Sequence, residues 1–199
     1  MALDNTKFYK SSYGKYGVSA RGVNWNSEFS QVVRFEVISD LLGDELKSSK
    51  IVDAGCGFGE LYAYWQKCES LPLEYVGLDC LQNSVDISTK RFGDSPNCSF
   101  TCRDVLRDDL PVADWYVSSG ALNILSSFET WLFLEKMLKF SKKGIVFNVL
   151  QGYIRSENFN YQTKEDMKEF AKDKNLEIVI VDGYLKNDMT IRMVKKNVK

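Results

Sequence analysis

Short runs of apolar and β-forming residues alternate along the chain with longer amphipathic segments. The short runs predict strands at 51–54, 75–78, 99–102, 115–118 and 145–149. Segments with apolar residues three and four positions apart predict helices at 24–43, 61–67, 82–92 and 128–140. Strands that alternate with helices, and are themselves largely apolar, predict a parallel sheet covered by helices on both faces.

The two ends of this pattern carry additional signals. The first helix is expected to bury a stripe formed by Phe29, Val33, Val37 and Leu41. Another helix is expected from Thr163, followed by strands at 177–181 and 190–194. The loop between these two strands is too short for a crossover, so they must run antiparallel. The predicted fold class is α/β, a doubly wound, mostly parallel seven-stranded sheet with an antiparallel C-terminal hairpin strand.

Composition and charge narrow the class of protein. The chain of 199 residues is 44% hydrophobic and has a formal net charge of −1, which suits one globular domain and disfavours binding to nucleic acid or an anionic membrane. We expect no membrane-spanning segment and no signal peptide. Five cysteines without a CxxC pair indicate neither a metal site nor a disulfide framework, and they favour a cytoplasmic location. Histidine is absent, which removes the commonest general base and metal ligand.

The segment 51–61 carries the clearest chemical signal. Asp53 ends an apolar run, and Gly55, Gly57 and Gly59 follow at alternate positions. A strand that ends in such a loop leaves its backbone open to a ligand. A dinucleotide fingerprint requires a third glycine three places after the second, where this chain has Glu60, so a nicotinamide cofactor is disfavoured.

At these residues the chain resembles the class I S-adenosylmethionine-dependent methyltransferases. Their first motif is matched by Asp53 and the three glycines, and later motifs are matched by Asp79 after the second strand, Asp104 after the third and 114–123 around the fourth. The resemblance implies a Rossmann-like fold and S-adenosyl-L-methionine as cofactor, with S-adenosyl-L-homocysteine as product. Asp79 would hold the ribose hydroxyls. The implied cofactor-binding set is Arg21, Asp53, Gly55, Cys56, Gly57, Gly59, Asp79, Cys80, Leu81, Asp104, Val105, Ser118 and Ser119.

The acceptor side is less defined. The aromatic and glycine-rich segment 1–25 is expected to form a lid or arm over a single domain at 26–199. Expected substrate-binding residues are Tyr13, Tyr16, Trp25, Asn123 and Tyr153. No catalytic residue is assigned, although Tyr16 or Tyr153 could act as a base.

The sequence therefore predicts a methyltransferase for a small-molecule acceptor, without a metal. Three alternatives stay open: a methyltransferase that acts on RNA or protein, a nicotinamide oxidoreductase, and a noncatalytic module that binds S-adenosylmethionine. The sequence leaves open the acceptor, the atom that is methylated and the oligomeric state.

Overall fold

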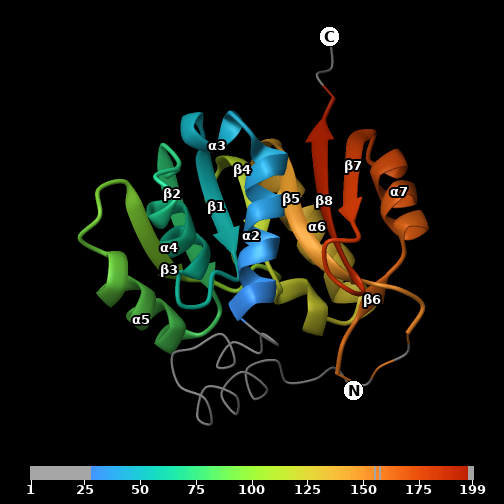
Figure 1. Ribbon diagram of the computed structural model, residues 1–199, viewed down its shortest axis with the longest axis horizontal. Coiled ribbons are helices and arrows are strands. Elements are labelled where there is room, and N and C mark those ends of the chain that lie inside the picture. Colours follow the sequence, from blue (N-terminus) through green and yellow to red (C-terminus); the bar gives the residue numbers. More distant parts are fainter. Residues whose placement is uncertain (1–27, 155, 157, 197–199) are drawn as a thin grey trace.

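The chain builds one mixed sheet in which the order of the strands along the sheet is β3-β2-β1-β4-β5-β8-β7 (Figure 1). The computed structural model describes residues 28–154, 156 and 158–196. Within them the strands are β1 (Lys50–Ala54), β2 (Glu74–Asp79), β3 (Cys98–Cys102), β4 (Ala113–Ser118), β5 (Ser141–Gln151), β6 (Tyr161–Gln162), β7 (Leu176–Asp182) and β8 (Asp188–Lys195). The helices are α2 (Glu28–Leu42), α3 (Glu45–Ser48), α4 (Glu60–Lys67), α5 (Gln82–Phe92), the 3-10 helix η2 (Ala121–Ile124), α6 (Ser127–Phe140) and α7 (Lys164–Asp173).

The strand directions confirm the predicted fold class. β1 to β5 are parallel, and β8 pairs antiparallel with both β5 and β7. The described sheet has eight strands rather than the seven predicted, because the short strand β6 pairs with the end of β5. A two-residue strand has too little pattern to be recognised from sequence.

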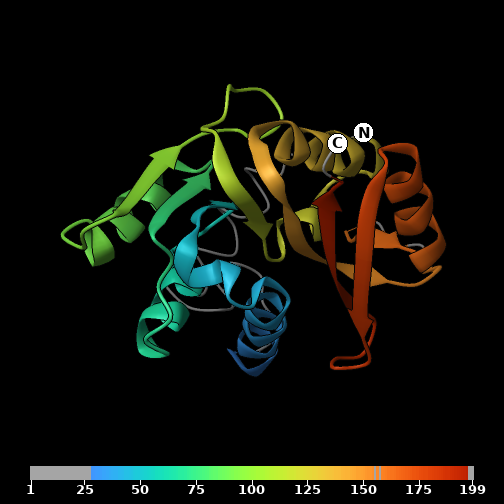
Figure 2. The ribbon, with the colours of Figure 1, turned by 90° about the horizontal axis from the view of Figure 1, so that it is seen from above.

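Helices cover both faces of the sheet, as Figure 2 shows. α2, α4 and α5 contribute Phe35, Trp65 and Phe92 to the core on one face, and α6 and α7 contribute Leu134 and Met167 to the core on the other. None of the helices in the described ranges is both long and apolar enough to cross a membrane.

The connection between β3 and β4 has no helix in the structure. Residues 103–112 form a loop whose Val105 and Leu110 are buried against the sheet. β3 lies at one edge, and its Ser99 and Thr101 are exposed because no helix covers that side of the strand. The loop runs from the carboxyl end of β3 to the start of β4, which lies on the other side of β2 and β1 in the sheet.

The predicted buried stripe of the first helix is wrong. Phe29 is 70% exposed, and the buried side chains of α2 are Gln31, Phe35, Ile38 and Leu42. The helix is rotated toward this second stripe because Ile38 and Leu42 fill the core on the face of the sheet that α2 covers, while Gln31 lies at the end of the sheet. The helix carries apolar side chains around much of its circumference, so periodicity alone does not select the buried face.

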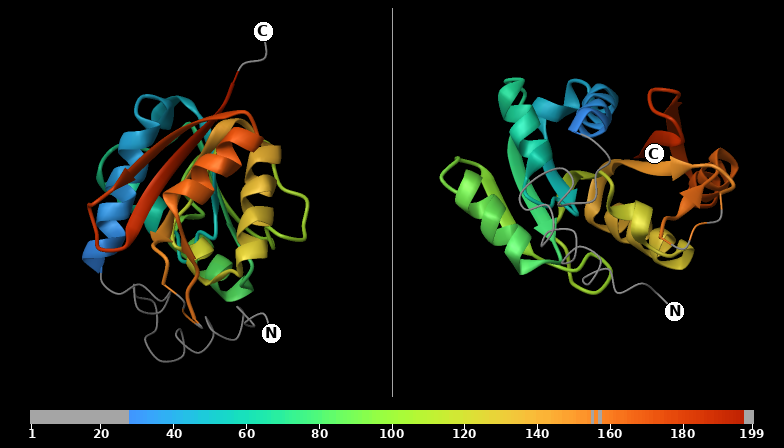
Figure 3. Two further views of the ribbon diagram at one scale, coloured as in Figure 1. Left: turned by 90° about the vertical axis from the view of Figure 1, so that its right-hand side faces the viewer. Right: turned by 60° about the horizontal axis from the view of Figure 1, so that its bottom comes forward.

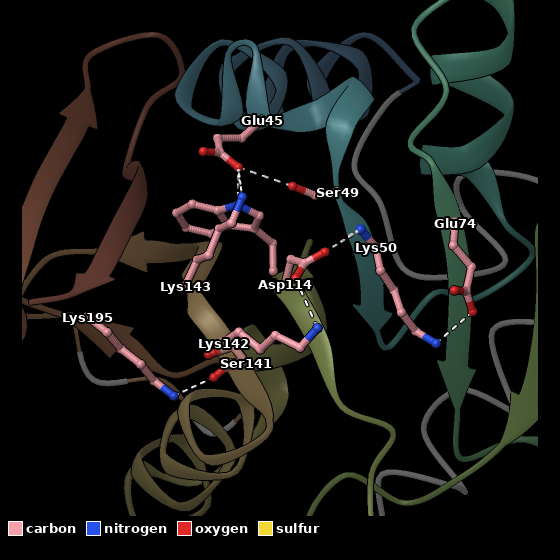
Figure 4. A network of polar contacts seen from close by, with 10 residues as sticks. Glu45, Ser49, Lys50, Glu74, Asp114, Ser141, Lys142, Lys143 and Lys195 are labelled. Atoms are coloured by element: carbon pink, nitrogen blue, oxygen red, sulfur yellow. Dashed lines mark hydrogen bonds and ion pairs between the residues drawn. The ribbon is translucent and has the colours of Figure 1, made fainter. Parts of the chain in front are cut away.

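Charged side chains join the starts of the parallel strands (Figure 4). The backbone N–H of Lys50 in β1 donates to Asp114 of β4 at 2.9 Å, and Asp114 also pairs with Lys142 of β5 at 3.3 Å. Lys143 pairs with Glu45 of α3 and lowers the pKa of that carboxyl. These contacts hold together the amino-terminal ends of the parallel strands, at the edge of the sheet opposite to their carboxyl ends.

Candidate functional site

A cavity of about 610 Å³ lies at the carboxyl ends of the parallel strands. Its volume is in the range of sites for small molecules and cofactors, and this edge of a doubly wound sheet is where such sites form. Its walls are the loops after β1, β2, β3 and β4, the 3-10 helix η2 and the side of α2. The right-hand view of Figure 3 brings this end of the sheet forward. Most residues predicted from the sequence line this cavity: Asp53, Gly55, Cys56, Gly57, Asp79, Cys80, Leu81, Asp104, Val105, Ser119 and Asn123.

The glycine loop after β1 forms the floor of the cavity. The N–H groups of Gly55 and Cys56 both donate to the carbonyl of Leu78, at 2.8 and 2.9 Å, which turns the loop toward β2. Gly55 has a φ of +83°, and a Cβ at this position would lie 2.5 Å from the Cβ of Ala121. The loop after β1 and the 3-10 helix after β4 can therefore approach each other only because Gly55 has no side chain.

Asp79 connects the loops after β1 and β2. Its Oδ2 accepts a hydrogen bond from the N–H of Gly57 at 2.9 Å, and its Oδ1 accepts one from the N–H of Leu81 at 2.9 Å. Burial raises the pKa of this carboxyl, and the two backbone hydrogen bonds act in the opposite direction. Each carboxylate oxygen can accept a further hydrogen bond, so Asp79 can organise the loop and still bind hydroxyl groups.

Asp53 lies at the end of β1 and is 2% exposed. The hydroxyl of Tyr75 in β2 donates to its Oδ2 at 2.7 Å. Burial raises the pKa of Asp53 to about 7; the hydrogen bond from Tyr75 lowers it, and the negative charge of Asp79 raises it. The carboxyl therefore changes its charge near neutral pH.

The loop after β3 forms one side wall. Asp104 lines the cavity, but its Oδ1 accepts a hydrogen bond from the N–H of Leu106 at 2.9 Å and its carboxylate lies 3.6 Å from Arg107. Val105 is buried beside it, and Cys80 and Leu81 lie on the wall formed after β2. Cys80, Leu81 and Val105 thus form an apolar wall with the carboxylate of Asp104 beside it. Contact of Asp104 with a ligand stays a prediction.

Two neighbouring serines at the end of β4 have different surroundings. Ser118 is fully buried, and its hydroxyl donates to the carbonyl of Ala54 at 2.7 Å, so it joins β4 to β1 and does not line the cavity. Ser119 lines the cavity, and its buried Oγ has no hydrogen-bond partner within the described residues. Such an atom is costly to leave without a partner, which makes Ser119 a suitable contact for a polar ligand.

Asn123 lies in η2 and is 8% exposed. Its Oδ1 accepts a hydrogen bond from the N–H of Leu150 at 3.1 Å, while the side chain also borders the cavity. The residue thus links the loop after β4 to the end of β5. Its predicted contact with the acceptor is not tested by this geometry.

Two further predicted residues, Gly59 and Tyr153, do not line the described cavity. Gly59 caps α4 with a φ of +80°, and a Cβ there would lie 3.0 Å from the ring of Phe92, so this glycine serves helix packing. Tyr153 is 84% exposed and absent from the walls of the cavity. Tyr13, Tyr16, Arg21 and Trp25, with the whole segment 1–25, lie outside the described residues.

The sequence interpretation missed two parts of the lining of the cavity. On one face of the sheet, α2 supplies Gln31, Arg34 and Phe35. On the other face, the segment from η2 to α6 supplies Ile124, Leu125 and Phe133. Arg34 donates through Nε to Asp188 of β8 at 2.6 Å, a pairing between residues 154 positions apart. No local motif indicates such a contact, although polar residues on an otherwise apolar helix stripe were a possible signal.

Comparisons with known proteins give a consistent fold. The sequence matches no protein-family profile and no curated protein. The structure of magnesium protoporphyrin IX methyltransferase (ChlM) from Synechocystis PCC 6803 with bound SAH superposes with a TM-score of 0.70 at 14% identity, over 98% of this chain and 96% of that one. The DhpI-SAM-HEP complex gives a TM-score of 0.72 at 11% identity, over 95% of each chain.

A third match covers a smaller share of its partner. The pyocyanin biosynthetic protein PhzM gives a TM-score of 0.70 at 16% identity, over 94% of this chain and 62% of that one. The chain is thus similar along nearly its whole length to proteins whose structures contain SAM or SAH. Together with the strand order, these matches show that the chain has the fold of the class I S-adenosylmethionine-dependent methyltransferases.

Proposed function

We propose that the protein is an enzyme that transfers a methyl group from S-adenosylmethionine to a small-molecule acceptor. The observation that carries this proposal is that the glycine loop, Asp79 and the apolar wall with Val105 all line one cavity at the carboxyl edge of the sheet. Their order along the chain also matches the order in which an amino-acid part, a ribose and an adenine would be bound.

The residues of the cavity fit this cofactor. Gly55 and Gly57 line the cavity with backbone alone, which would let the methionine part approach the main chain closely. The carboxylates of Asp53 and Asp79 suit an ammonium group and a ribose diol, respectively. Glu60 lies at the start of α4 and pairs with Arg91 of α5. Its carboxylate would repel a pyrophosphate, so the cavity suits S-adenosylmethionine better than a dinucleotide.

The bound cofactor supplies an electrophilic methyl group on a sulfonium. The protein then has to bind the acceptor in line with that group and exclude water. Phe133, Leu125 and Phe159 provide an apolar wall, and Ser119 offers an unpartnered hydroxyl, within the described residues. No tyrosine is among the described residues that line the cavity, so no general base is assigned. An acceptor that is already nucleophilic would not require one.

The names of the similar proteins support a small acceptor. ChlM is named for magnesium protoporphyrin IX, and PhzM for pyocyanin biosynthesis. The net charge of −1 gives no general attraction to nucleic acid, in line with a small-molecule partner. A methyltransferase acting on RNA or protein is the second candidate, and a noncatalytic binding module is the third.

Two measurements test the proposal. Isothermal titration calorimetry should show binding of S-adenosylmethionine and S-adenosylhomocysteine but not of NADH. Incubation with methyl-labelled cofactor and a fractionated cell extract should then place the label in low-mass products, identified by mass spectrometry. Label in RNA or protein would favour the second candidate. Cofactor binding without any labelled product would favour the noncatalytic module, and a lack of binding would refute the proposal.

A further inference from the structure

Tyr75 holds the acidic residue that precedes the glycine loop. Its hydroxyl donates to Oδ2 of Asp53 at 2.7 Å, and the two residues are only 1% and 2% exposed. Within the described residues this is the one hydrogen bond to the Asp53 carboxylate, so Oδ1 can still accept one from a ligand in the cavity that Asp53 lines.

The register of β1 and β2 explains how the hydroxyl reaches Asp53. Tyr75 pairs with Ile51, and Asp53 pairs with Gly77, one step further along the same face of the two strands. Because Gly77 has no side chain, the phenol can extend diagonally past it to the carboxylate. A larger residue at 77 would also contact Phe100 and Cys56, where a Cβ would lie 2.5 and 2.9 Å from the nearest atoms.

The ring of Tyr75 is fixed by other aromatic rings. Its centroid lies 5.0 Å from Tyr62, 5.7 Å from Phe100 and 6.1 Å from Trp65. These contacts are tilted or edge-on, which is favourable for aromatic pairs. The hydroxyl is therefore held in place by packing that does not depend on the carboxylate.

The charges around Asp53 give this hydrogen bond a function. The titratable groups that shift the pKa of Asp53 are Tyr75 and Asp79 of β2. Asp53 in turn raises the pKa of the Cys56 thiol in the loop, while Arg34 of α2 lines the same cavity and pairs with Asp188. Burial and the nearby Asp79 favour the neutral form of Asp53, and the donor from Tyr75 favours the ionised form. Among these groups, Tyr75 is thus the neighbour that favours the negative charge.

We propose that Tyr75 is a positioning residue, whose hydroxyl orients the Asp53 carboxylate and keeps it ionised so that it binds the primary ammonium group of the ligand. This inference rests on the proposed function, in which that ammonium belongs to the methionine part of the cofactor. Tyr75 itself does not contact the ligand.

The test compares Tyr75→Phe with a matched variant, Tyr116→Phe. Tyr116 is also a fully buried tyrosine in a central strand, but its hydroxyl donates to the carbonyl of Pro111 at 2.5 Å and it does not line the cavity. Binding of S-adenosylhomocysteine, which carries the same ammonium group, is measured by calorimetry between pH 6 and 8.5. Denaturant unfolding of each variant reports its stability.

The wild type should bind more tightly as the pH rises through neutrality, because Asp53 becomes ionised. Tyr75→Phe should bind about tenfold more weakly at pH 7, and its affinity should recover at a higher pH than in the wild type. Tyr116→Phe should keep the pH profile of the wild type. Asp53→Asn should give a flat profile, and adding Tyr75→Phe to Asp53→Asn should change the affinity little.

Each other outcome is distinct. If the wild type does not bind S-adenosylhomocysteine, the proposed function fails together with this inference. If the wild type binds and Tyr75→Phe keeps the same pH profile, the inference alone is overturned. The inference would also be overturned if Tyr75→Phe weakened binding equally in the wild type and in the Asp53→Asn variant, because Tyr75 would then act through packing. Should Tyr75→Phe fail to fold, a pH profile of Asp53→Asn equal to that of the wild type would overturn it as well.

Discussion

Replacing Gly55 by alanine tests how closely the loops around the cavity approach each other. Gly183, in the hairpin between β7 and β8, has the same φ of +83°, but a Cβ added there would meet no atom within 4 Å, so Gly183→Ala is a matched control. Both variants carry the strain of a side chain at positive φ, about 1–2 kcal/mol. Gly55→Ala adds an overlap with Ala121, whose Cβ would be 2.5 Å away.

The overlap should make the two variants clearly different. Overpacking of this kind destabilises proteins by about 1–3 kcal/mol, so Gly55→Ala should lose roughly that much more unfolding free energy than Gly183→Ala. Urea unfolding followed by circular dichroism measures both values. Gly55→Ala should also weaken the binding of S-adenosylmethionine, because the loop must shift, whereas Gly183→Ala should leave it unchanged.

A second substitution separates strain from overlap. Ala121→Gly removes the methyl group that the new Cβ would meet. The double variant with Gly55→Ala should therefore regain the stability lost to the overlap, but not the stability lost to the strain at positive φ. The coupling between the two sites should be about 1 kcal/mol or more. Equal losses of unfolding free energy from Gly55→Ala and Gly183→Ala, with no coupling to position 121, would refute this reasoning. The loop after β1 would then not approach Ala121 so closely that only glycine fits at position 55.

Three further predictions follow from the buried carboxylates. Asp79→Ala should weaken the binding of S-adenosylmethionine by about 2 kcal/mol or more in calorimetry, and unchanged affinity would contradict the ribose role. Asp188→Ala should lower the free energy of unfolding by about 3–5 kcal/mol, because it leaves the guanidinium of Arg34 without its buried carboxylate; a loss under about 1 kcal/mol in urea would contradict this. The pKa of Asp53, raised from 3.8 to about 7, means that the folded state binds the extra proton in this interval, so stability from this group falls as the pH rises from about 4 to about 7. Asp53→Asn should therefore reduce the fall in stability over that interval, which unfolding at several pH values would show.

Much of the fold could be predicted because each element carries a local signal. The helix α5 has the predicted bounds, and α7 begins after Thr163, as predicted, where Thr163 and Asp166 form a capping box. The antiparallel β8 followed from the length of one loop. The strand β6 and the short helices α3 and η2 could not be predicted, since elements this short have no measurable period.

The site was predictable where a strand ends and unpredictable where two distant segments meet. Asp53 and Asp79 follow apolar runs and do line the cavity. Ser118 and Ser119 are adjacent in sequence, but successive side chains of a strand point in opposite directions, so only Ser119 reaches the cavity. Arg34 could not be predicted as part of the site, because its partner Asp188 is distant in sequence and comes close only in the folded sheet.

The reversed direction of β8 determines where the polypeptide leaves the domain. Because β8 is antiparallel to β5, Lys195 lies beside Ser141, at the start of β5 and on the side of the sheet away from the cavity (Figure 1). An affinity tag or surface attachment joined after β8 would therefore leave the mouth of the cavity unobstructed. The protein could be immobilised through this end to capture its unknown acceptor directly from a metabolite mixture.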